Sequence, residues 1–310
     1  MARKRGRRST GQIFLYILSG VVVLSMALGY AFLAAPSQPA TPTQAPAART
    51  ANPAAPTPGP SPTPTPVPSI TPVPVAPRPT LDPSVATYSF AVIGETAGNP
   101  DVYRALLKQI EADGNSFVIH LGNMVERGSA AEFQAWRELM ADFPLPVYPV
   151  PGNQDALDGS LANYLAFTGA PGVHYSFDRG QVHFAVVDAS RGYLGAEETA
   201  WLDADLAATQ KPVKIVALHD PPFDPRGSDQ VLTMGNEAFT VLMRQRGVRY
   251  VFAGHIRAYD QTTRDGVIYV ISGGGGAPLS RSEDQGGFYH YVRVSVNGTD
   301  IQTEARRLTP

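Results

Sequence analysis

Short apolar runs alternate with amphipathic segments from Thr87 onward, and this alternation limits the fold more than any other feature of the chain. Apolar runs that end at a glycine or a turn residue predict strands, whereas apolar residues at helical spacing predict helices. The runs SFAVIG (89–94), FVIHLG (117–122) and VYPVPG (147–152) are separated by two helical segments. This order implies a mostly parallel sheet with right-handed crossovers, so the sequence predicts an α/β domain.

Residues that favour helix N-termini mark both of these helices. Asn99, Pro100 and Asp101 supply a side-chain cap, a fixed φ and a carboxylate in the first turn. They predict a helix that ends at Ala112, and Ser129 predicts the start of the second helix. Further along, the pattern predicts a hairpin at 173–178 and 182–188, strands at 213–219, 249–255 and 267–273, helices at 196–207 and near 235–246, and two C-terminal strands, YHYVRVSV and IQTEARRL.

The N-terminal segments predict a membrane anchor. Residues 1–12 hold five basic side chains, and residues 13–35 are uncharged and mostly apolar. About twenty apolar helical residues cross a bilayer, so we expect a single transmembrane helix at 13–35. A cleaved signal peptide and a buried core helix are the alternatives. The basic flank predicts that residues 1–12 are cytoplasmic and that the remainder lies outside the cell membrane.

Residues 36–80 are rich in Pro, Thr and Ala. Proline fixes φ and lacks an N–H group, so this segment is expected to form neither a helix nor a strand ladder. We expect a semi-rigid spacer with an upper reach of roughly 140 Å at about 3.1 Å per residue. A disordered tail without a spacing role is the alternative. Residues 81–310 are the predicted folded domain.

The predicted domain is acidic and contains no cysteine. Seven of the 25 Lys and Arg residues precede Asp82, the first acidic residue, so residues 81–310 carry 18 basic and 27 acidic side chains. Nucleic-acid binding draws on clustered basic charge, so we expect no nucleic-acid partner. Without cysteine the chain has neither disulfides nor thiolate metal ligands.

Five polar side chains follow five of the predicted strands: Glu95, Asn123, Asn153, His219 and His255. Ligands of open α/β sheets bind beyond the carboxyl ends of the strands. One Asp or Asn at such a position is uninformative, because both residues are common in turns. Five oxygen- or nitrogen-bearing side chains, two of them histidines, indicate a site for a metal or a phosphate group.

The segments around these residues resemble the five successive motifs of the calcineurin-like metallophosphoesterases. In chain order they are IGETAG (93–98), HLGNMVERG (120–128), PGNQD (151–155), LHDPPFDP (218–225) and FAGHIR (252–257). The resemblance covers roughly residues 88–277 and implies two packed β-sheets flanked by helices, a four-layer αββα sandwich. It also implies a centre of two metals, Fe, Mn, Zn or similar, that activates a bridging hydroxide to attack a phosphate ester.

Several motifs depart from the family pattern. Glu95-Thr96-Ala97 stands for D-x-H, Gly122-Asn123 for G-D, Gly152-Asn153-Gln154-Asp155 for G-N-H-D/E, and Gly254-His255-Ile256-Arg257 for G-H-x-H. By this resemblance one metal uses the positions of Glu95, Ala97, Asn123 and Arg257. Alanine is no ligand and arginine is a permanent cation, so we expect this metal to be absent. We also expect Arg257 to pair with Glu95 in its place; the alternative is that both side chains point into solvent.

The other metal position, by the same resemblance, uses Asn123, Asn153, His219 and His255. Since an Asn123 amide replaces the bridging carboxylate, we expect weak binding of at most one divalent metal (Mn, Fe or Zn), or of none. Gln154 and Asp155 form the altered general-acid motif. Glutamine donates a hydrogen bond but does not shuttle protons near neutral pH. Asp155 either orients a neighbouring group or caps the segment after Asn153.

Four further histidines lie in or beside predicted strands: His120, His174, His183 and His290. We expect them to be packed or hydrogen-bonded rather than metal ligands. Three functional hypotheses follow from the sequence. The chain is a phosphoesterase of low activity with one metal, a pseudoenzyme that binds a phosphate-bearing ligand or a surface protein, or a scaffold for surface interactions.

Overall fold

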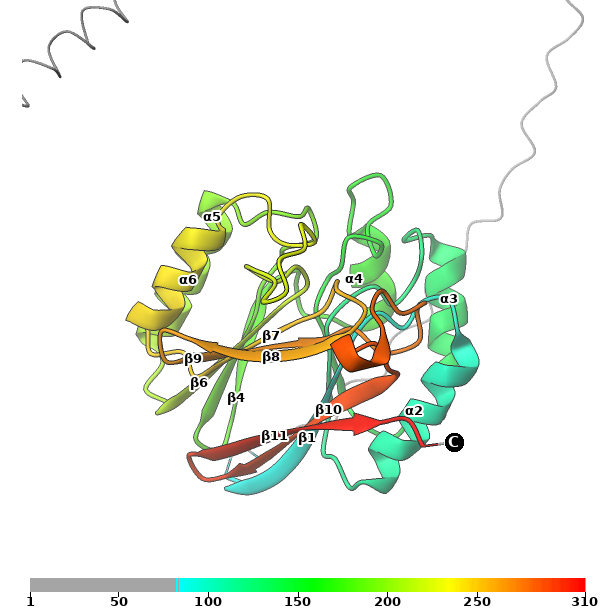
Figure 1. Ribbon diagram of the computed structural model, residues 1–310, viewed down its shortest axis with the longest axis horizontal. Coiled ribbons are helices and arrows are strands. Elements are labelled where there is room, and N and C mark those ends of the chain that lie inside the picture. Colours follow the sequence, from blue (N-terminus) through cyan, green and yellow to red (C-terminus); the bar gives the residue numbers. More distant parts are fainter. Residues whose placement is uncertain (1–81, 83, 310) are drawn as a thin grey trace, which may run out of the picture. The chain divides into compact units, whose positions relative to one another are not determined.

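The computed structural model describes residues 82 and 84–309. The predicted segments 1–12, 13–35 and 36–80 lie outside the described residues, so the membrane anchor and the spacer stay predictions. Among the described residues, every helix is too short or too polar to cross a bilayer. These residues form two β-sheets that pack face to face, with helices on both outer sides (Figure 1).

The first sheet has five strands in the order β11-β10-β1-β2-β3. They are β1 (Thr87–Ile93), β2 (Val118–His120), β3 (Val147–Pro149), β10 (His290–Asn297) and β11 (Asp300–Arg307). β1, β2 and β3 are parallel, whereas β10 and β11 are antiparallel to their neighbours. The outer face packs against three helices, α2 (Pro100–Ala112), α3 (Ala130–Leu139) and α4 (Ala162–Thr168).

The second sheet has six strands in the order β4-β5-β6-β7-β9-β8. They are β4 (Tyr175–Arg179), β5 (Val182–Val186), β6 (Val213–Leu218), β7 (Tyr250–Ala253), β8 (Tyr259–Arg264) and β9 (Val267–Ser272). Two helices, α5 (Ala196–Ala208) and α6 (Asn236–Gln245), cover its outer face (Figure 1). A short 3₁₀ helix, η1 (Glu283–Gln285), precedes β10.

Aromatic side chains fill the space between the two sheets. Phe90 and Phe117 of the first sheet stack with ring centroids 4.8 Å apart, and Phe184 of the second sheet meets both rings edge-on. Side chains alternate along β1, so Phe90 faces the second sheet while Ala91 faces the helices. The predicted fold of two packed sheets with flanking helices is confirmed.

The predicted helix starts are also confirmed. Asn99 accepts a hydrogen bond from the Val102 N–H at the start of α2, and Ser129 forms a capping box with Glu132 at the start of α3. The parallel arrangement predicted for the first three strands is confirmed, since β1, β2 and β3 are parallel. Both sheets are nevertheless mixed, because β1 with β10, β4 with β5, β8 with β9 and β10 with β11 are antiparallel pairs.

Three elements were not predicted: β8, α4 and the short η1. β8 reads YDQTTR and lies at the edge of its sheet, where half of the side chains face water. Such a strand has no apolar alternation by which to recognise it. α4 has only seven residues, and no side chain caps its N-terminus.

Candidate functional site

The predicted strand-end residues lie together at one edge of the two sheets. They are Glu95 after β1, Asn123 after β2, Asn153 after β3, His219 after β6 and His255 after β7. Hydrogen bonds join the loops that carry them: the Glu95 N–H donates to the Gly122 carbonyl (3.1 Å), and His219 Nδ1 contacts the Leu121 carbonyl (2.6 Å). The second contact crosses from one sheet to the other, so the site is built by both sheets.

The backbone at this edge is strained. Glu95, Asn123 and His255 have φ values of 60°, 55° and 61°, in the left-handed region that residues with a Cβ rarely adopt. Only two further non-glycine residues in the described part of the chain share this conformation. Each of these turns costs about 1–3 kcal/mol, and such strain collects at functional sites. It turns the side chains inward, directly after the strands end.

A close approach of two loops also requires glycine. A Cβ atom on Gly152 would lie 2.4 Å from Asn123 Oδ1, well inside van der Waals contact. The glycines of the predicted motifs therefore allow the loops after β2 and β3 to touch. Backbone conformation and loop contact of this kind have no direct signature in the local sequence pattern.

His219 presents an unprotonated nitrogen to the site. The side chain is fully buried, and burial lowers its pKa to about 3, so the imidazole is neutral. Because Nδ1 faces the Leu121 carbonyl oxygen, that nitrogen carries the hydrogen and donates it. Nε2 therefore has a free lone pair.

Three further electron-pair donors surround His219 Nε2. Asn153 Oδ1 lies at 3.0 Å, His255 Nδ1 at 3.3 Å and Glu95 Oε1 at 3.6 Å. The Asn123 amide donates to Asn153 Oδ1 (3.1 Å), which turns the Asn153 oxygen toward the cluster. Four atoms with lone pairs thus converge on one point.

His255 is oriented by a carboxylate behind it. Its Nε2 lies 3.5 Å from Asp220 Oδ1, which favours a hydrogen on Nε2 and a lone pair on Nδ1. Burial lowers the pKa of His255, with Arg257 acting in the same direction, so this imidazole is also neutral. Burial also raises the pKa of Asp220 to about 7, and its Oδ2 is a buried atom without a hydrogen-bond partner. Asp220 lies in the predicted segment LHDPPFDP (218–225), directly after His219, and the structure adds its contact with His255.

Glu95 has two oxygens in different environments. Oε2 accepts a hydrogen bond from Arg257 Nε at 3.0 Å, which confirms the predicted pairing. Oε1 faces His219 and has no hydrogen-bond partner. Burial raises the pKa of Glu95 to about 8, and the Arg257 guanidinium opposes that rise. Since Glu95 is only 1 % exposed, the alternative in which both side chains face solvent is wrong.

The donor atoms fit one divalent cation. Ligand bonds of about 2.0–2.2 Å place neighbouring ligand atoms roughly 3.0–3.5 Å apart around a single ion. The separations from His219 Nε2 are 3.0, 3.3 and 3.6 Å, and ligand atoms of Glu95, His219 and His255 all lie within 4.8 Å of one another. Imidazole and carboxylate ligands suit Zn, Fe and Mn.

Comparison with known proteins identifies the family of this site. The model of the calcineurin-like phosphoesterases matches residues 88–259. The chain belongs to the calcineurin-like phosphoesterase family. Members of this family usually bind divalent metals, and Glu95, His219 and His255 form a group that could hold one.

Curated relatives in this family are phosphodiesterases and phosphatases. The chain is 26% identical over 180 residues to a 3',5'-cyclic-nucleotide phosphodiesterase of Nostoc sp.. This alignment covers 55% of this chain and 67% of that protein. It is 31% identical over 117 residues to purple acid phosphatase 23 of Arabidopsis thaliana, covering 34% of this chain and 26% of that protein. It is 26% identical over 165 residues to the 3',5'-cyclic adenosine monophosphate phosphodiesterase CpdA of Escherichia coli, covering 50% and 59%. The chain thus matches between a quarter and two thirds of these relatives' lengths.

Solved structures share the phosphoesterase fold. PhoD aligns with a TM-score of 0.55 and 13% identity over 74% of this chain and 67% of that chain. GAP50, the anchor in the inner membrane complex of Plasmodium, aligns with a TM-score of 0.57 and 13% identity over 73% and 90%. At these identities the likeness concerns the fold alone.

The Asn123 side chain joins two loops of the site: its Oδ1 accepts from the Gln154 N–H (3.0 Å) and its Nδ2 donates to Asn153. Both ends of the amide are therefore engaged in holding loops of the phosphoesterase site. The expected role of Asn123 as a metal ligand stays a prediction. Glu95, assigned by resemblance to the other metal, also reaches the cluster, with Oε1 3.6 Å from His219 Nε2. The longer glutamate side chain makes this reach possible.

Asp155 lies behind the site rather than in it. The side chain is fully buried, and its oxygens accept four backbone N–H groups, those of Gly152, Asn123, Met124 and Val125. Burial raises the pKa of Asp155 to about 7, while these hydrogen bonds oppose the rise. Of the two predicted roles, orienting neighbouring groups fits these contacts. Gln154 is half-buried and joins Asn123 through its backbone; its catalytic role stays a prediction.

The four other histidines have hydrogen-bond partners within the protein, as expected. His120 contacts Thr96 Oγ1 at 3.0 Å, and His290 contacts the Phe288 carbonyl at 2.8 Å. His174 contacts Glu198 at 2.7 Å. His183 lies between two carboxylates, those of Asp178 and Asp205.

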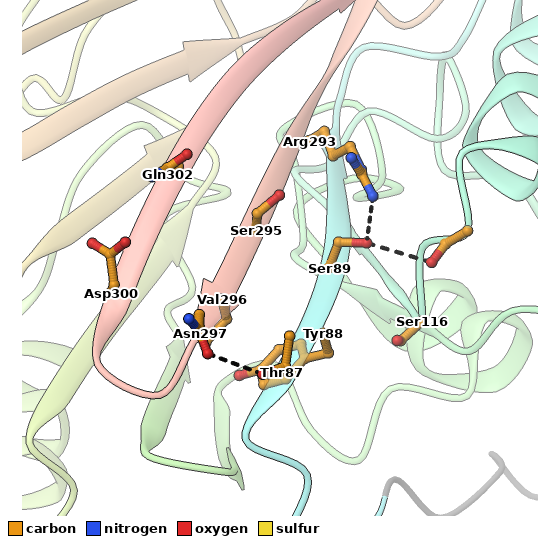
Figure 2. A pocket seen from close by; sticks show the side chains of 11 residues that line it. Thr87, Tyr88, Ser89, Ser116, Arg293, Ser295, Val296, Asn297, Asp300 and Gln302 are labelled. Atoms are coloured by element: carbon orange, nitrogen blue, oxygen red, sulfur yellow. Dashed lines mark hydrogen bonds between the residues drawn. The ribbon is translucent and has the colours of Figure 1, made fainter.

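A separate polar hollow lies on the outer face of the first sheet (Figure 2). It measures about 770 Å³ and is bordered by β1, β10 and β11. Thr87 donates to Asn297 (3.0 Å), and Arg293 donates to Ser89 (3.3 Å), so these side chains are partly paired with one another. The hollow contains none of the strand-end residues of the phosphoesterase site.

Proposed function

We propose that this chain is a phosphoesterase-family protein whose cleft holds one divalent cation and binds the phosphate group of an ester. The observation that carries the proposal is the convergence of four lone pairs on one point, with Glu95 Oε1 buried and unpartnered. A buried acceptor without a donor is costly, and a cation at this point would remove the cost.

Four residues would hold the cation: Glu95, Asn153, His219 and His255. A bound divalent cation supplies Lewis-acid polarisation of a phosphoryl oxygen and lowers the pKa of bound water. Asn123 fixes the Asn153 oxygen, and Asp220 fixes the His255 ring. Arg257 adds a permanent positive charge beside the cation.

We further propose that hydrolysis is slow and restricted to activated esters. Gln154 stands where family members have the histidine beside the leaving group, and an amide does not supply a proton. General acid catalysis contributes roughly 10²- to 10⁴-fold, so a loss of about this size is expected for poor leaving groups. The phosphodiesterases among the relatives suggest a phosphodiester as the ligand class.

A second candidate is a module that binds a phosphate ester without turnover. Gln154 and Ala97 favour this candidate, because both positions have lost side chains that the family uses in catalysis. The inward pairing of Arg257 with Glu95 supports either phosphate-binding role over a fold used only as a scaffold.

The proposed location is the outer face of the cell membrane. The uncharged run at 13–35 would be the single-pass anchor, the basic residues 1–12 its cytoplasmic end, and residues 36–80 the spacer. Protease added to intact cells should then degrade the folded domain. Survival of the domain in this experiment would place it in the cytoplasm.

The test uses the full chain purified in detergent. Elemental analysis after incubation with Mn²⁺, Fe²⁺ and Zn²⁺ should find one ion per chain. Bis(p-nitrophenyl) phosphate should be hydrolysed slowly, and methyl p-nitrophenyl phosphate only with loss of p-nitrophenol. Two ions per chain, or none, would overturn the one-metal proposal. One ion with phosphate binding and no turnover would favour the second candidate.

A further inference from the structure

We propose that the Arg257 guanidinium takes the place of the second cation, and that Glu95 bridges it to the metal position as a carboxylate bridges two metals. The guanidinium then contacts a phosphate oxygen of the ligand directly. This inference rests on the proposed function, because it concerns the ligand of the same cleft.

The two oxygens of Glu95 face opposite partners. Oε2 lies 3.0 Å from Arg257 Nε, and Oε1 lies 3.6 Å from His219 Nε2. The Glu95 side chain is buried, so the surrounding side chains and loops restrict its carboxyl group to this orientation. A carboxylate in this position joins two positive charges, one permanent and one bound.

Asn123 is not suited to this bridging role. The Asn123 amide occupies the position of the family's bridging carboxylate, but it is neutral and both of its ends are engaged. The extra methylene of Glu95, about 1.5 Å of reach, lets its carboxylate extend into the cluster. The Glu95 backbone is fixed on both sides, by the Gly122 carbonyl (3.1 Å) and the Ala277 N–H (2.8 Å).

Arg257 keeps most of its donors free for a ligand. Its contact with Glu95 uses Nε, and no residue in the described range 84–309 hydrogen-bonds to its two Nη atoms. An Arg–carboxylate pair can form two parallel hydrogen bonds, which would engage one Nη group as well. The single contact seen here leaves both the Nη groups and Glu95 Oε1 available. The side chain is 31% exposed, so an anion in the cleft has access to it.

The surrounding loops hold Arg257 in place. The Ser280 N–H donates to the Arg257 carbonyl (3.1 Å), and the preceding Ile256 is fully buried. A Cβ on Gly273 would lie 2.1 Å from the Ile256 carbonyl, so the loop after β9 packs directly on this segment. The guanidinium is thus positioned by two loops of the site.

The chemistry of the cleft changes as a result. A guanidinium binds phosphate oxygens through charge-assisted hydrogen bonds but does not activate water. The exchange therefore preserves the recognition of phosphate and removes the bridging hydroxide. It also adds a positive charge where a second metal would have to bind, so it excludes that metal.

The test measures the binding of Mn²⁺ and of inorganic phosphate by the full chain, by calorimetry and elemental analysis. Arg257→Ala should still bind one Mn²⁺ per chain and should lose phosphate affinity about 10- to 100-fold. Arg257→Lys should lose less, because it keeps the charge but not the fork of donors. Arg246→Ala is the matched control: it removes an arginine paired with Asp203 on the helices of the second sheet, and should leave both affinities unchanged.

A restoration variant tests the exclusion of the second metal. Combining Arg257→His, Ala97→His and Asn123→Asp should raise the stoichiometry from one Mn²⁺ to two. Unchanged phosphate affinity in Arg257→Ala, with one Mn²⁺ bound and an unchanged melting temperature, would overturn this inference and leave the proposed function standing. An absence of Mn²⁺ binding by the wild-type chain would instead overturn the proposed function.

Discussion

Two histidines of this protein, His219 and His183, are both buried, but their pKa values are shifted in opposite directions. Each has polar atoms close to both ring nitrogens: Leu121 O and Asn153 Oδ1 at His219, and the carboxylates of Asp178 and Asp205 at His183. Burial lowers the pKa of His219 to about 3, and only a backbone carbonyl opposes it. Burial also lowers the pKa of His183, but Asp205 and Asp178 raise it, and the net result is a raised pKa.

The difference follows from the charge of the partners. Two carboxylates at 2.7 and 2.8 Å call for an N–H on each ring nitrogen of His183, so the imidazolium itself is the cation. At His219 the single hydrogen goes to the Leu121 carbonyl, and Nε2 faces other lone pairs. His183 can therefore neutralise its two carboxylate partners when it is protonated. His219 Nε2 instead offers a lone pair to a cation that the chain itself does not supply.

The largest effect on Mn²⁺ affinity is expected from substitution of His219, which lies in the proposed metal site. His219→Ala should weaken Mn²⁺ binding by about 100-fold or more, because it removes the donor at the centre of the cluster. His183→Ala should leave Mn²⁺ affinity unchanged, since its partners lie on β4 and α5. Calorimetric titration of both variants checks this prediction, and equal losses in the two would contradict it.

A smaller effect is expected behind the site. Asp220→Asn should weaken Mn²⁺ binding about tenfold, because the carboxylate that orients the His255 ring loses its charge. The melting temperature without metal should not fall. If Mn²⁺ affinity is unchanged in Asp220→Asn, the carboxylate does not orient the ligand.

The pH dependence of the free energy of unfolding tests the charge that we assign to His183. Its folded pKa lies above the ordinary value of 6.5, so its contribution is complete below about pH 6.5 and is lost as pH rises through the folded pKa. The folded pKa of Asp205 is lowered, so the carboxylate contribution is lost as pH falls below 3.8. Wild type should therefore exceed His183→Gln by about 1–2 kcal/mol in free energy of unfolding near pH 5–6, and by less at pH 9. Urea denaturation at each pH measures this; a difference that grows with pH would contradict the assignment of a cationic His183.

The smallest effect separates the two carboxylates. Asp205 is 16% exposed and also accepts from Ser176, whereas Asp178 is 43% exposed. Asp205→Asn should cost about 1 kcal/mol in free energy of unfolding, and Asp178→Asn about 0.5 kcal/mol or less, because exposed pairs are screened by water. Urea denaturation at pH 6 compares the free energies of unfolding of the two variants. A larger loss for Asp178→Asn would show that the more exposed carboxylate contributes more to stability, contrary to this prediction.

Much of the site was predictable because its residues follow local patterns. Glu95, Asn123, Asn153, His219 and His255 each follow an apolar run, and parallel strands bring such positions to one edge. The pairing of Arg257 with Glu95 was also predicted, from an anion kept and a cation gained at one family metal position. The helix starts followed from capping residues alone.

The roles within the site were less predictable. The sequence placed Asn123 among the ligands and Glu95 at the other metal position, but it did not show that Glu95 approaches His219 or that Asp220 contacts His255. Each of these assignments depends on where a side chain points after a left-handed turn, and on hydrogen bonds between loops distant in sequence. Residue type and spacing carry little information on either.

The sequence by itself determined the two-sheet α/β fold, the family and the set of residues that reach one edge, because hydrophobic period, capping and motif order are local properties. Tertiary structure alone decided which lone pairs face one another: Glu95 Oε1, Asn153 Oδ1 and the two histidine nitrogens. It also decided that two carboxylates raise the pKa of His183, whereas burial lowers the pKa of His219. The physical reason is that protonation and ligand geometry depend on burial and on the charge of spatial neighbours, which only the folded chain brings together.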